Sequence, residues 1–195
     1  TETVRIMAAY NSIPAQLAKE NRKFQYKVIK TGAKAGIYEI PLDWLKASGI
    51  VIVCRKVSMG FFPLPAYVEP NSFKVYFTDT GLLCLKYGLS FNQILSEFSG
   101  IDQIKGALAE NYVAAALTSN GYEPSYWESQ GKAEVDFVIQ NAQGQVIPIE
   151  VKSSENVRSK SLVEFKKRYR PPYSVRVSAK NFGMENGIKS VPLYA

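Results

Sequence analysis

The chain has 195 residues, of which 46% are hydrophobic and 21% are charged, a balance typical of folded globular proteins. No apolar run approaches the length of about 20 residues that a membrane helix needs, and no secretory signal opens the chain, so we expect a cytoplasmic protein with no membrane partner. The absence of histidine excludes Ser-His-Asp and Cys-His catalysis and histidine-ligated zinc. Carboxylates, lysines and tyrosines must carry any reaction.

The charge balance favours a polyanionic partner such as DNA. Lysine and arginine together number 24 and the acidic residues 17, which gives a net charge of +7. Cys54 and Cys84 lack paired spacing and lie in apolar surroundings, which predicts reduced core thiols. The chain starts at Thr1 without an initiator methionine and holds no GxxxxGK[ST] phosphate loop, so we expect a piece of a longer protein.

Residues 1–69 predict an N-terminal winged helix-turn-helix domain. The first predicted helix covers residues 3–10, and the second covers 12–21 with Ser12 as N-cap and Pro14 in its first turn. Further helices are expected at 22–31 and 38–48, followed by a strand at 50–57. The prolines at 63, 65 and 70 cannot donate backbone hydrogen bonds, so they favour a connector or wing.

Residues 70–195 predict a second domain, an α/β sandwich. Helices are expected at 80–87, 91–98, 103–119 and 158–169, and strands at 73–77, 122–127, 133–140, 145–152, 173–179 and 187–193. The order helix, three strands, helix, strand predicts a right-handed crossover in its last connection. The predicted fold class of the whole chain is α+β.

Two neighbouring strands carry the candidate catalytic residues. Period-two alternation places Glu134 and Asp136 on one face of the first strand, and Glu150 and Lys152 on one face of the second. The turn at 141–144 is centred near residue 143, and this register sets Asp136 opposite Glu150 and Glu134 opposite Lys152. Two facing carboxylates repel each other, and either a divalent cation or a shared proton would offset that repulsion.

Pro148 leaves the register open, because it removes a ladder donor and is typical of a bulge or an edge strand. A slip of one residue would turn the charged side chains to the other face. Carboxylates on an exposed strand face also commonly form ordinary solvated ion pairs. Against this, Glu110 lies on a packed helix face and needs a partner, which a metal ion would supply. Lys152 would then orient the attacking water or stabilise charge on the scissile phosphate.

Glu110 on a helix, Asp136 on a strand and Glu150-Val151-Lys152 on the next strand resemble the PD-(D/E)xK nuclease and Holliday-junction-resolvase superfamily. Val135 stands where that motif usually has proline. The resemblance implies a restriction-endonuclease-like α/β sandwich over residues 70–195. It also implies that Glu110, Asp136 and Glu150 bind Mg²⁺ or Mn²⁺ and that Lys152 assists catalysis.

A closer resemblance is to an uncharacterised domain that follows an AAA+ P-loop ATPase module and a winged helix in bacterial and archaeal proteins. It is carried by FKVYF at 73–77 with DTGLL at 79–83, KGALAEN at 105–111, AEVDF at 133–137 and PIEVKS at 148–153. The resemblance implies an AAA+ ATPase module before Thr1, and it assigns ATP binding to that module. We expect a DNA-binding and phosphodiester-hydrolysing region. The alternative is a non-catalytic nucleic-acid or protein docking module of the ATPase.

Two basic clusters are candidate nucleic-acid contacts. The first has the spacing of a helical stripe, with Arg22 beside it, and consists of Lys19, Lys23, Lys27, Lys30 and Lys34. The second cluster includes Lys166, Lys167 and Arg168 and follows the candidate site. A solvated helix face explains the first cluster equally well. Tyr122, Tyr126 and Trp127 have the spacing of core residues rather than of base-stacking platforms.

Overall fold

The computed structural model describes residues 1–90, 92–93, 102–129, 131, 133–153 and 160–195. The chain forms two compact units, and each combines two stretches of sequence. Unit 1 comprises Thr1–Val53 and Ser72–Ala115, and unit 2 comprises Cys54–Asn71 and Ala116–Ala195. Each unit thus takes residues from both sides of position 70, where the sequence predicts a domain boundary.

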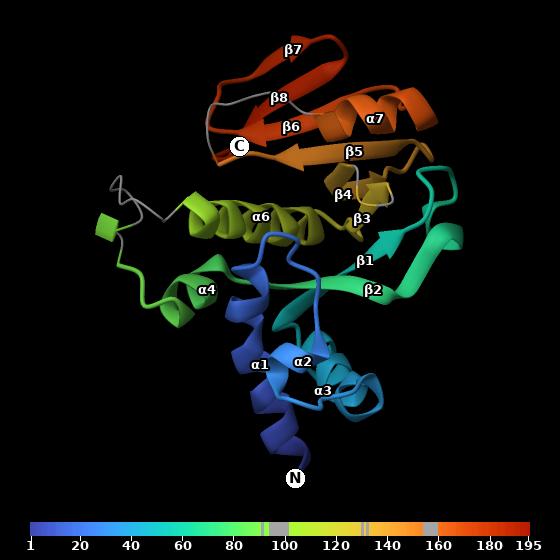
Figure 1. Ribbon diagram of the computed structural model, residues 1–195. Coiled ribbons are helices and arrows are strands. Elements are labelled where there is room, and N and C mark those ends of the chain that lie inside the picture. The colour runs from blue at the N-terminus through green and yellow to red at the C-terminus, as the bar shows by residue number, and fades with distance from the viewer. Residues whose placement is uncertain (91, 94–101, 130, 132, 154–159) are drawn as a thin grey trace. The chain divides into compact units, whose positions relative to one another are not determined.

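The architecture is mixed α and β, which confirms the predicted α+β class at this level. The described α-helices are α1 (Glu2–Leu17), α2 (Tyr26–Ile29), α3 (Ala35–Ala47), α4 (Thr80–Lys86), α6 (Asp102–Ser119) and α7 (Lys160–Tyr169), and a 3-10 helix covers Leu64–Tyr67 (Figure 1). None of these helices is both long and apolar enough to cross a membrane.

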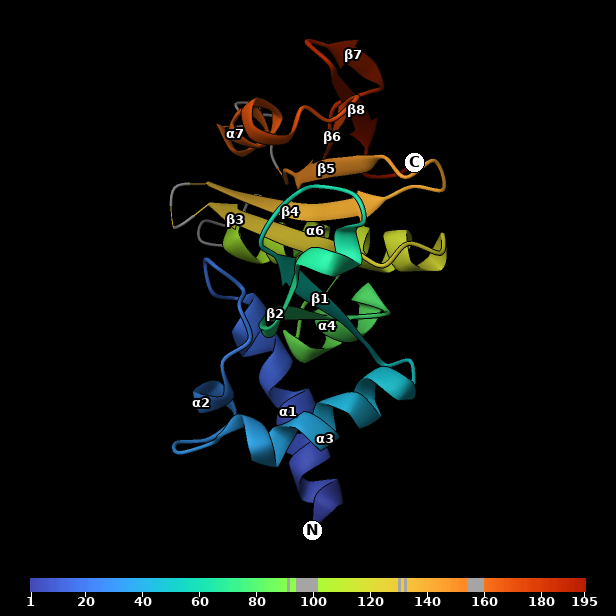
Figure 2. The ribbon, with the colours of Figure 1, turned by 90° about the vertical axis from the view of Figure 1, so that its right-hand side faces the viewer.

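Eight strands form one mixed sheet. They are β1 (Val51–Val57), β2 (Val68–Phe77), β3 (Ser125–Ser129), β4 (Ala133–Gln140), β5 (Val146–Val151), β6 (Ser174–Ser178), β7 (Gly183–Glu185) and β8 (Ile188–Pro192). The strand order is β2-β1-β3-β4-β5-β6-β8-β7. The run β3-β4-β5 is antiparallel, and β5-β6-β8 is parallel. These five strands and β7, which pairs antiparallel with β8, belong to unit 2. Strands β3, β4 and β5 lie side by side in Figure 2.

The prediction of two helices on either side of residue 11 is wrong, because α1 runs unbroken through that position. Ser12 does not act as an N-cap, since its hydroxyl donates to the Ala9 carbonyl inside the helix (2.7 Å). Ala9, Ile13 and Leu17 are fully buried at a spacing of four residues. This continuous buried face outweighs the local signals at Ser12 and Pro14.

The predicted helix at 22–31 is also wrong, because only Tyr26–Ile29 is helical. Arg22 adopts a left-handed backbone conformation with φ of 48°. Phe24 donates its backbone N–H to the Phe73 carbonyl (2.9 Å), and the two rings stack with centroids 5.4 Å apart. A long-range contact with β2 therefore replaces the helical hydrogen bonds that local spacing favoured.

Most other predicted elements are confirmed with small shifts in their ends. The helix expected at 38–48 begins three residues earlier, and β2 begins at Val68 and includes Pro70. The sequence missed the three-residue strand β7. The helix predicted at 91–98 lies mostly outside the described residues.

The core of unit 2 lies where α7 packs against the sheet. It is made of Val57, Leu64, Trp127, Val135, Val138, Val146, Leu162 and Phe165. Trp127 meets Phe165 edge to face, with centroids 5.3 Å apart. Trp127 and Tyr126 are almost completely buried, which confirms the core interpretation for these two residues, whereas Tyr122 is half-buried.

Gly60 is a packing requirement of this core. A Cβ atom at Gly60 would come within 2.3 Å of the Phe165 ring, and Phe165 is itself fully buried.

We expect Gly60→Ala to lower the free energy of unfolding by about 2 kcal/mol through overpacking, measured by urea denaturation. Gly36→Ala is the matched control. It meets nothing within 4 Å on helix α3, so it should raise stability by about 0.5 kcal/mol. Equal effects of the two changes would contradict the packing argument.

Tyr87 links α4 to α1 in unit 1 by donating its hydroxyl to the Pro14 carbonyl (2.9 Å). Burial raises the pKa of Tyr87 to about 12, and the nearby Arg22 lowers it only in part. An unfolded tyrosine ionises near pH 10. The stability that depends on the protonated Tyr87 is therefore fully present below about pH 10 and is lost as pH rises to about 12.

Replacing Tyr87 with phenylalanine should flatten the fall in stability over this pH range, measured by chemical denaturation at several pH values. Tyr194→Phe is the control, because Tyr194 is 74% exposed. An unchanged pH profile in the Tyr87 variant would show that this hydroxyl does not cause the fall.

Candidate functional site

The β4–β5 hairpin has the register that the sequence predicts. Phe137 faces Ile149, and Gln140 faces Val146, a pairing that is symmetric about residue 143. The turn is closed by the backbone N–H of Asn141, which donates to the Gln145 carbonyl (3.0 Å). Pro148 faces Val138 within this ladder. Since β5 lies between β4 and β6, Pro148 marks neither a slipped register nor an edge strand.

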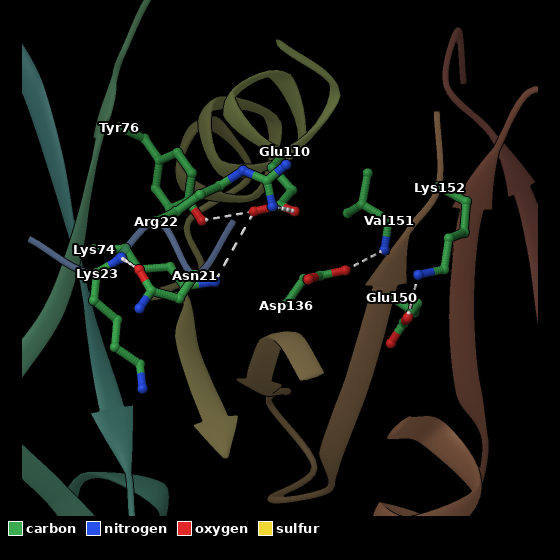
Figure 3. Close-up of polar contacts among 10 residues, drawn as sticks. All are labelled: Asn21, Arg22, Lys23, Lys74, Tyr76, Glu110, Asp136, Glu150, Val151 and Lys152. Atoms are coloured by element: carbon green, nitrogen blue, oxygen red, sulfur yellow. Dashed lines mark hydrogen bonds and ion pairs between the residues drawn. The ribbon is translucent and has the colours of Figure 1, made fainter. Parts of the chain in front are cut away.

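A β-bulge directs the side chain of Asp136. On β3, Ser125 faces Val138 and Trp127 faces Val135, so β4 advances by one extra residue between these pairs. The ladder with β5 begins at Phe137. Asp136 lies in the bulge, and its Oδ2 accepts a hydrogen bond from the backbone N–H of Val151 (2.7 Å) (Figure 3). Bulges of this kind are common beside active sites because they re-aim one side chain.

Glu150 and Lys152 lie together at the C-terminal end of β5. The Lys152 ammonium is 2.6 Å from Glu150 Oε1, and the two side chains are 33% and 4% exposed. All six residues of β5 are buried, so the sheet is covered on both faces here. The shared face of the two residues is confirmed, and a solvated strand face does not describe Glu150.

Hydrogen bonding and an ion pair offset the predicted repulsion between Asp136 and Glu150. Asp136 accepts the Val151 N–H, and Glu150 is neutralised by Lys152. Neither a cation nor a shared proton is needed to explain these contacts. Glu134 lies outside the β4–β5 ladder and faces Glu128 on β3.

Glu110 belongs to unit 1, and three side chains of that unit surround it. Arg22 Nη1 lies 2.6 Å from Glu110 Oε1, the Tyr76 hydroxyl donates to Oε2 (3.1 Å), and Lys74 Nζ lies 4.0 Å from Oε2 (Figure 3). Glu110 is only 4% exposed, so its charge needs these partners. From the sequence we expect a metal ion as the partner of Glu110. In the structure, side chains of the protein itself take that place.

Lys74 and Tyr76 are residues that sequence reasoning missed. Both lie on β2 and are fully buried. Their side chains share one face of the strand, because they are two residues apart. The available signal was a lysine inside the apolar segment FKVYF, since a buried lysine almost always has a charged partner.

The donors of unit 2 fit a divalent cation by their chemistry. Among the residues that the structure describes, no three His, Cys, Asp or Glu side chains are grouped so that they could hold a metal ion. Asp136 and Glu150 are nevertheless a pair of hard oxygen donors on neighbouring strands. Mg²⁺ in phosphoryl-transfer sites takes one or two protein carboxylates and completes its shell with water and phosphate. Two carboxylates match the number of protein ligands that such a site uses.

The predicted nucleic-acid contacts of unit 1 do not form one helical stripe, because the segment from Lys19 to Lys30 is mostly non-helical. Lys27 and Lys30 are exposed, and Lys19 lies 3.5 Å from Gln25 Oε1. The Arg22 side chain is 14% exposed and engaged by Glu110, so little of it is open to a phosphate. Lys23 is half-buried in the same segment.

The basic residues of α7 in unit 2 differ in their exposure and in their contacts with other residues. Lys167 is exposed. Lys166 donates to the Asn186 carbonyl (2.5 Å). Arg168 pairs with Glu164 (2.7 Å) and lies over the Trp127 ring, with its guanidinium carbon 5.4 Å from the centroid. Lys167 is therefore the residue of this cluster that is most accessible to a polyanion.

Glu110 should contribute strongly to stability. Removing its carboxylate leaves the Arg22 charge buried without its partner, so Glu110→Ala should lower the free energy of unfolding by about 3 kcal/mol. The Lys56–Glu69 pair is the comparison, since its carboxylate side chain is 40% exposed. Glu69→Ala should cost less than about 1 kcal/mol. Thermal or urea denaturation measures both, and similar losses would contradict a special role for the Glu110 cluster.

Two family models match this chain. Residues 105–195 match a domain of unknown function (DUF4143), and residues 1–93 match another domain of unknown function (DUF8612). Each match covers a little less than half of the chain. The N-terminal match ends at residue 93 and the C-terminal match begins at residue 105. No curated protein and no solved structure gives a significant match. The chain is thus similar over residues 105–195 to an uncharacterised domain, as the sequence motifs indicate.

Proposed function

We propose that this chain is the DNA-binding, C-terminal part of an AAA+ ATPase-type protein, and that its unit 2 hydrolyses phosphodiesters at a divalent-metal site. The observation that supports the proposal is that Asp136 accepts the Val151 N–H, while Glu150 and Lys152 on either side of Val151 form an ion pair. Domains of the family matched at 105–195 are commonly the C-terminal part of AAA-ATPase-like proteins, which supports the assignment of an ATPase module.

The finer fold proposal has two parts. Helices α1 to α3 followed by β1 are the elements of a winged helix. The order β3-β4-β5-α7-β6, with an antiparallel hairpin and then a parallel crossover, is consistent with the restriction-endonuclease-like sandwich that the PD-(D/E)xK resemblance implies.

Each residue of the site has a distinct chemical task. Mg²⁺ or Mn²⁺, when bound, would supply Lewis acidity and lower the pKa of a bound water. Asp136 and Glu150 would hold the cation through oxygen atoms. The Val151 N–H keeps the Asp136 carboxylate oriented. Lys152 would exchange its contact with Glu150 for the attacking water or the negative charge that develops on the phosphate.

The predicted role of Glu110 as a third ligand is not part of this proposal, because Arg22 and Tyr76 of unit 1 hold its carboxylate. Lys167 on α7, and Lys19, Lys23, Lys27 and Lys30 in unit 1, are proposed to neutralise backbone phosphates. These contacts would position DNA without reading its sequence.

A non-catalytic docking module is the second candidate. It is favoured by the mutual neutralisation of Glu150 and Lys152 and by the closed cluster around Glu110. In such a module the same charges would serve only to stabilise the sheet and α6, while the basic surface binds DNA or a protein partner.

A cleavage assay with single-stranded, duplex and branched DNA in Mg²⁺ and in Mn²⁺ separates the two candidates. We expect the wild type to cleave, and Asp136→Asn and Lys152→Ala to lose at least 100-fold in rate, roughly the effect of removing a group that stabilises transition-state charge. Asp136→Asn keeps an oxygen acceptor for the Val151 N–H, so its fold should survive. Glu185→Gln is the control, because Glu185 is an exposed carboxylate on β7.

The same samples give a second readout, since a cation that binds only the folded protein raises its melting temperature. We expect Mn²⁺ to stabilise the wild type and Glu185→Gln, but not Asp136→Asn. No cleavage of any substrate, together with no Mn²⁺ stabilisation, would refute the catalytic proposal and leave the docking module.

A further inference from the structure

Arg176 lies beside the candidate site, although no motif includes it. It is the central residue of β6, which lies between β5 and β8. In the parallel pairing of β5 with β6, Arg176 faces Glu150 directly. The backbone N–H of Lys152 also donates to the Val177 carbonyl (2.9 Å), so the two strands stay paired to the end that carries Glu150 and Lys152.

The register places Arg176 and Glu150 on the same face of the sheet. Residues that face each other on neighbouring strands point to the same side, and the strands lie about 4.8 Å apart. Lys152 shares this face, because it follows Glu150 by two residues. A carboxylate in the middle of the face is therefore flanked by one cation along its own strand and by another across the sheet.

The neighbours of Arg176 on β6 leave room for its long side chain. Ser174 and Ser178 are the next residues on its face, and both are small and fully buried. Arg176 itself is half-buried.

We propose that Arg176 is a substrate-binding residue of this site, and that it holds a backbone phosphate next to the phosphodiester to be cleaved. The proposal rests on the proposed function of unit 2. An arginine fork can donate two parallel hydrogen bonds to a phosphate, which a lysine cannot do. A phosphate contact carries no sequence information, so the substrate class is a nucleic-acid backbone of unrestricted sequence.

The test measures binding separately from cleavage. A short fluorescently labelled DNA duplex is titrated with the full chain in Ca²⁺ at several salt concentrations, and the slope of log affinity against log salt is compared between variants. Arg176→Gln should weaken binding and reduce the magnitude of the slope by about 1, the effect of losing one phosphate contact. Arg176→Lys should keep the slope but bind more weakly than the wild type, because it lacks the fork.

Lys189→Gln is the matched control. Lys189 faces Val175 on the neighbouring strand β8, hence on the opposite face of the sheet, and its ammonium lies 3.6 Å from the centroid of the Tyr173 ring. Lys189→Gln removes one positive charge, as Arg176→Gln does, but from the opposite face of the sheet. We expect its slope to equal that of the wild type.

Three outcomes would overturn the proposal. They are an unchanged slope in Arg176→Gln, an equal change of slope in Lys189→Gln, and no binding of the duplex by the wild type. A lower melting temperature of Arg176→Gln with an unchanged slope would assign the residue to the fold alone. If the wild type binds but does not cleave in Mn²⁺, the hydrolase proposal fails, and the slope still decides whether Arg176 contacts phosphate.

Discussion

The candidate site depends on one hydrogen bond, from the Val151 N–H to the Asp136 carboxylate (2.7 Å). In a regular antiparallel ladder this N–H would donate to a backbone carbonyl of β4. The ladder between β4 and β5 begins only at Phe137, and the Asp136 carboxylate accepts the Val151 N–H beside it. The same bond anchors the end of β5, where Glu150 and Lys152 follow each other on one face. Backbone geometry, rather than a set of loops, thus brings the charged groups together.

Both units bury charge, but they balance it differently. In unit 1 the Glu110 carboxylate has an arginine, a lysine and a tyrosine hydroxyl around it. In unit 2 the pair of Glu150 and Lys152 is partly open, since the lysine side chain is 33% exposed. An enclosed pair is expensive to break, whereas a half-exposed lysine can exchange partners at low cost. The exchangeable charges therefore lie in unit 2.

The sequence predicts the β4–β5 hairpin well, because alternation and turn chemistry are local properties. Its register about residue 143 and the shared face of Glu150 and Lys152 are confirmed. The sequence could not reveal the bulge at Asp136, since that depends on how β3 pairs with β4. It also predicted a helix at 22–31, where pairing of Phe24 with Phe73 decides the conformation. The partners of Glu110 were hidden for the same reason, because Arg22 is 88 residues away.

That separation also constrains how unit 1 can assemble. Joining Arg22 to Glu110 closes a loop of 88 residues, and the entropy of closure must be overcome before the contact is formed. Helices α1 and α3 can pack on each other early, since they lie close in sequence. During synthesis, however, the ion pair between Arg22 and Glu110 can form only after α6 has left the ribosome. Until then the Arg22 guanidinium and the Lys74 ammonium have no carboxylate from α6, so the nascent unit lacks this charged cluster.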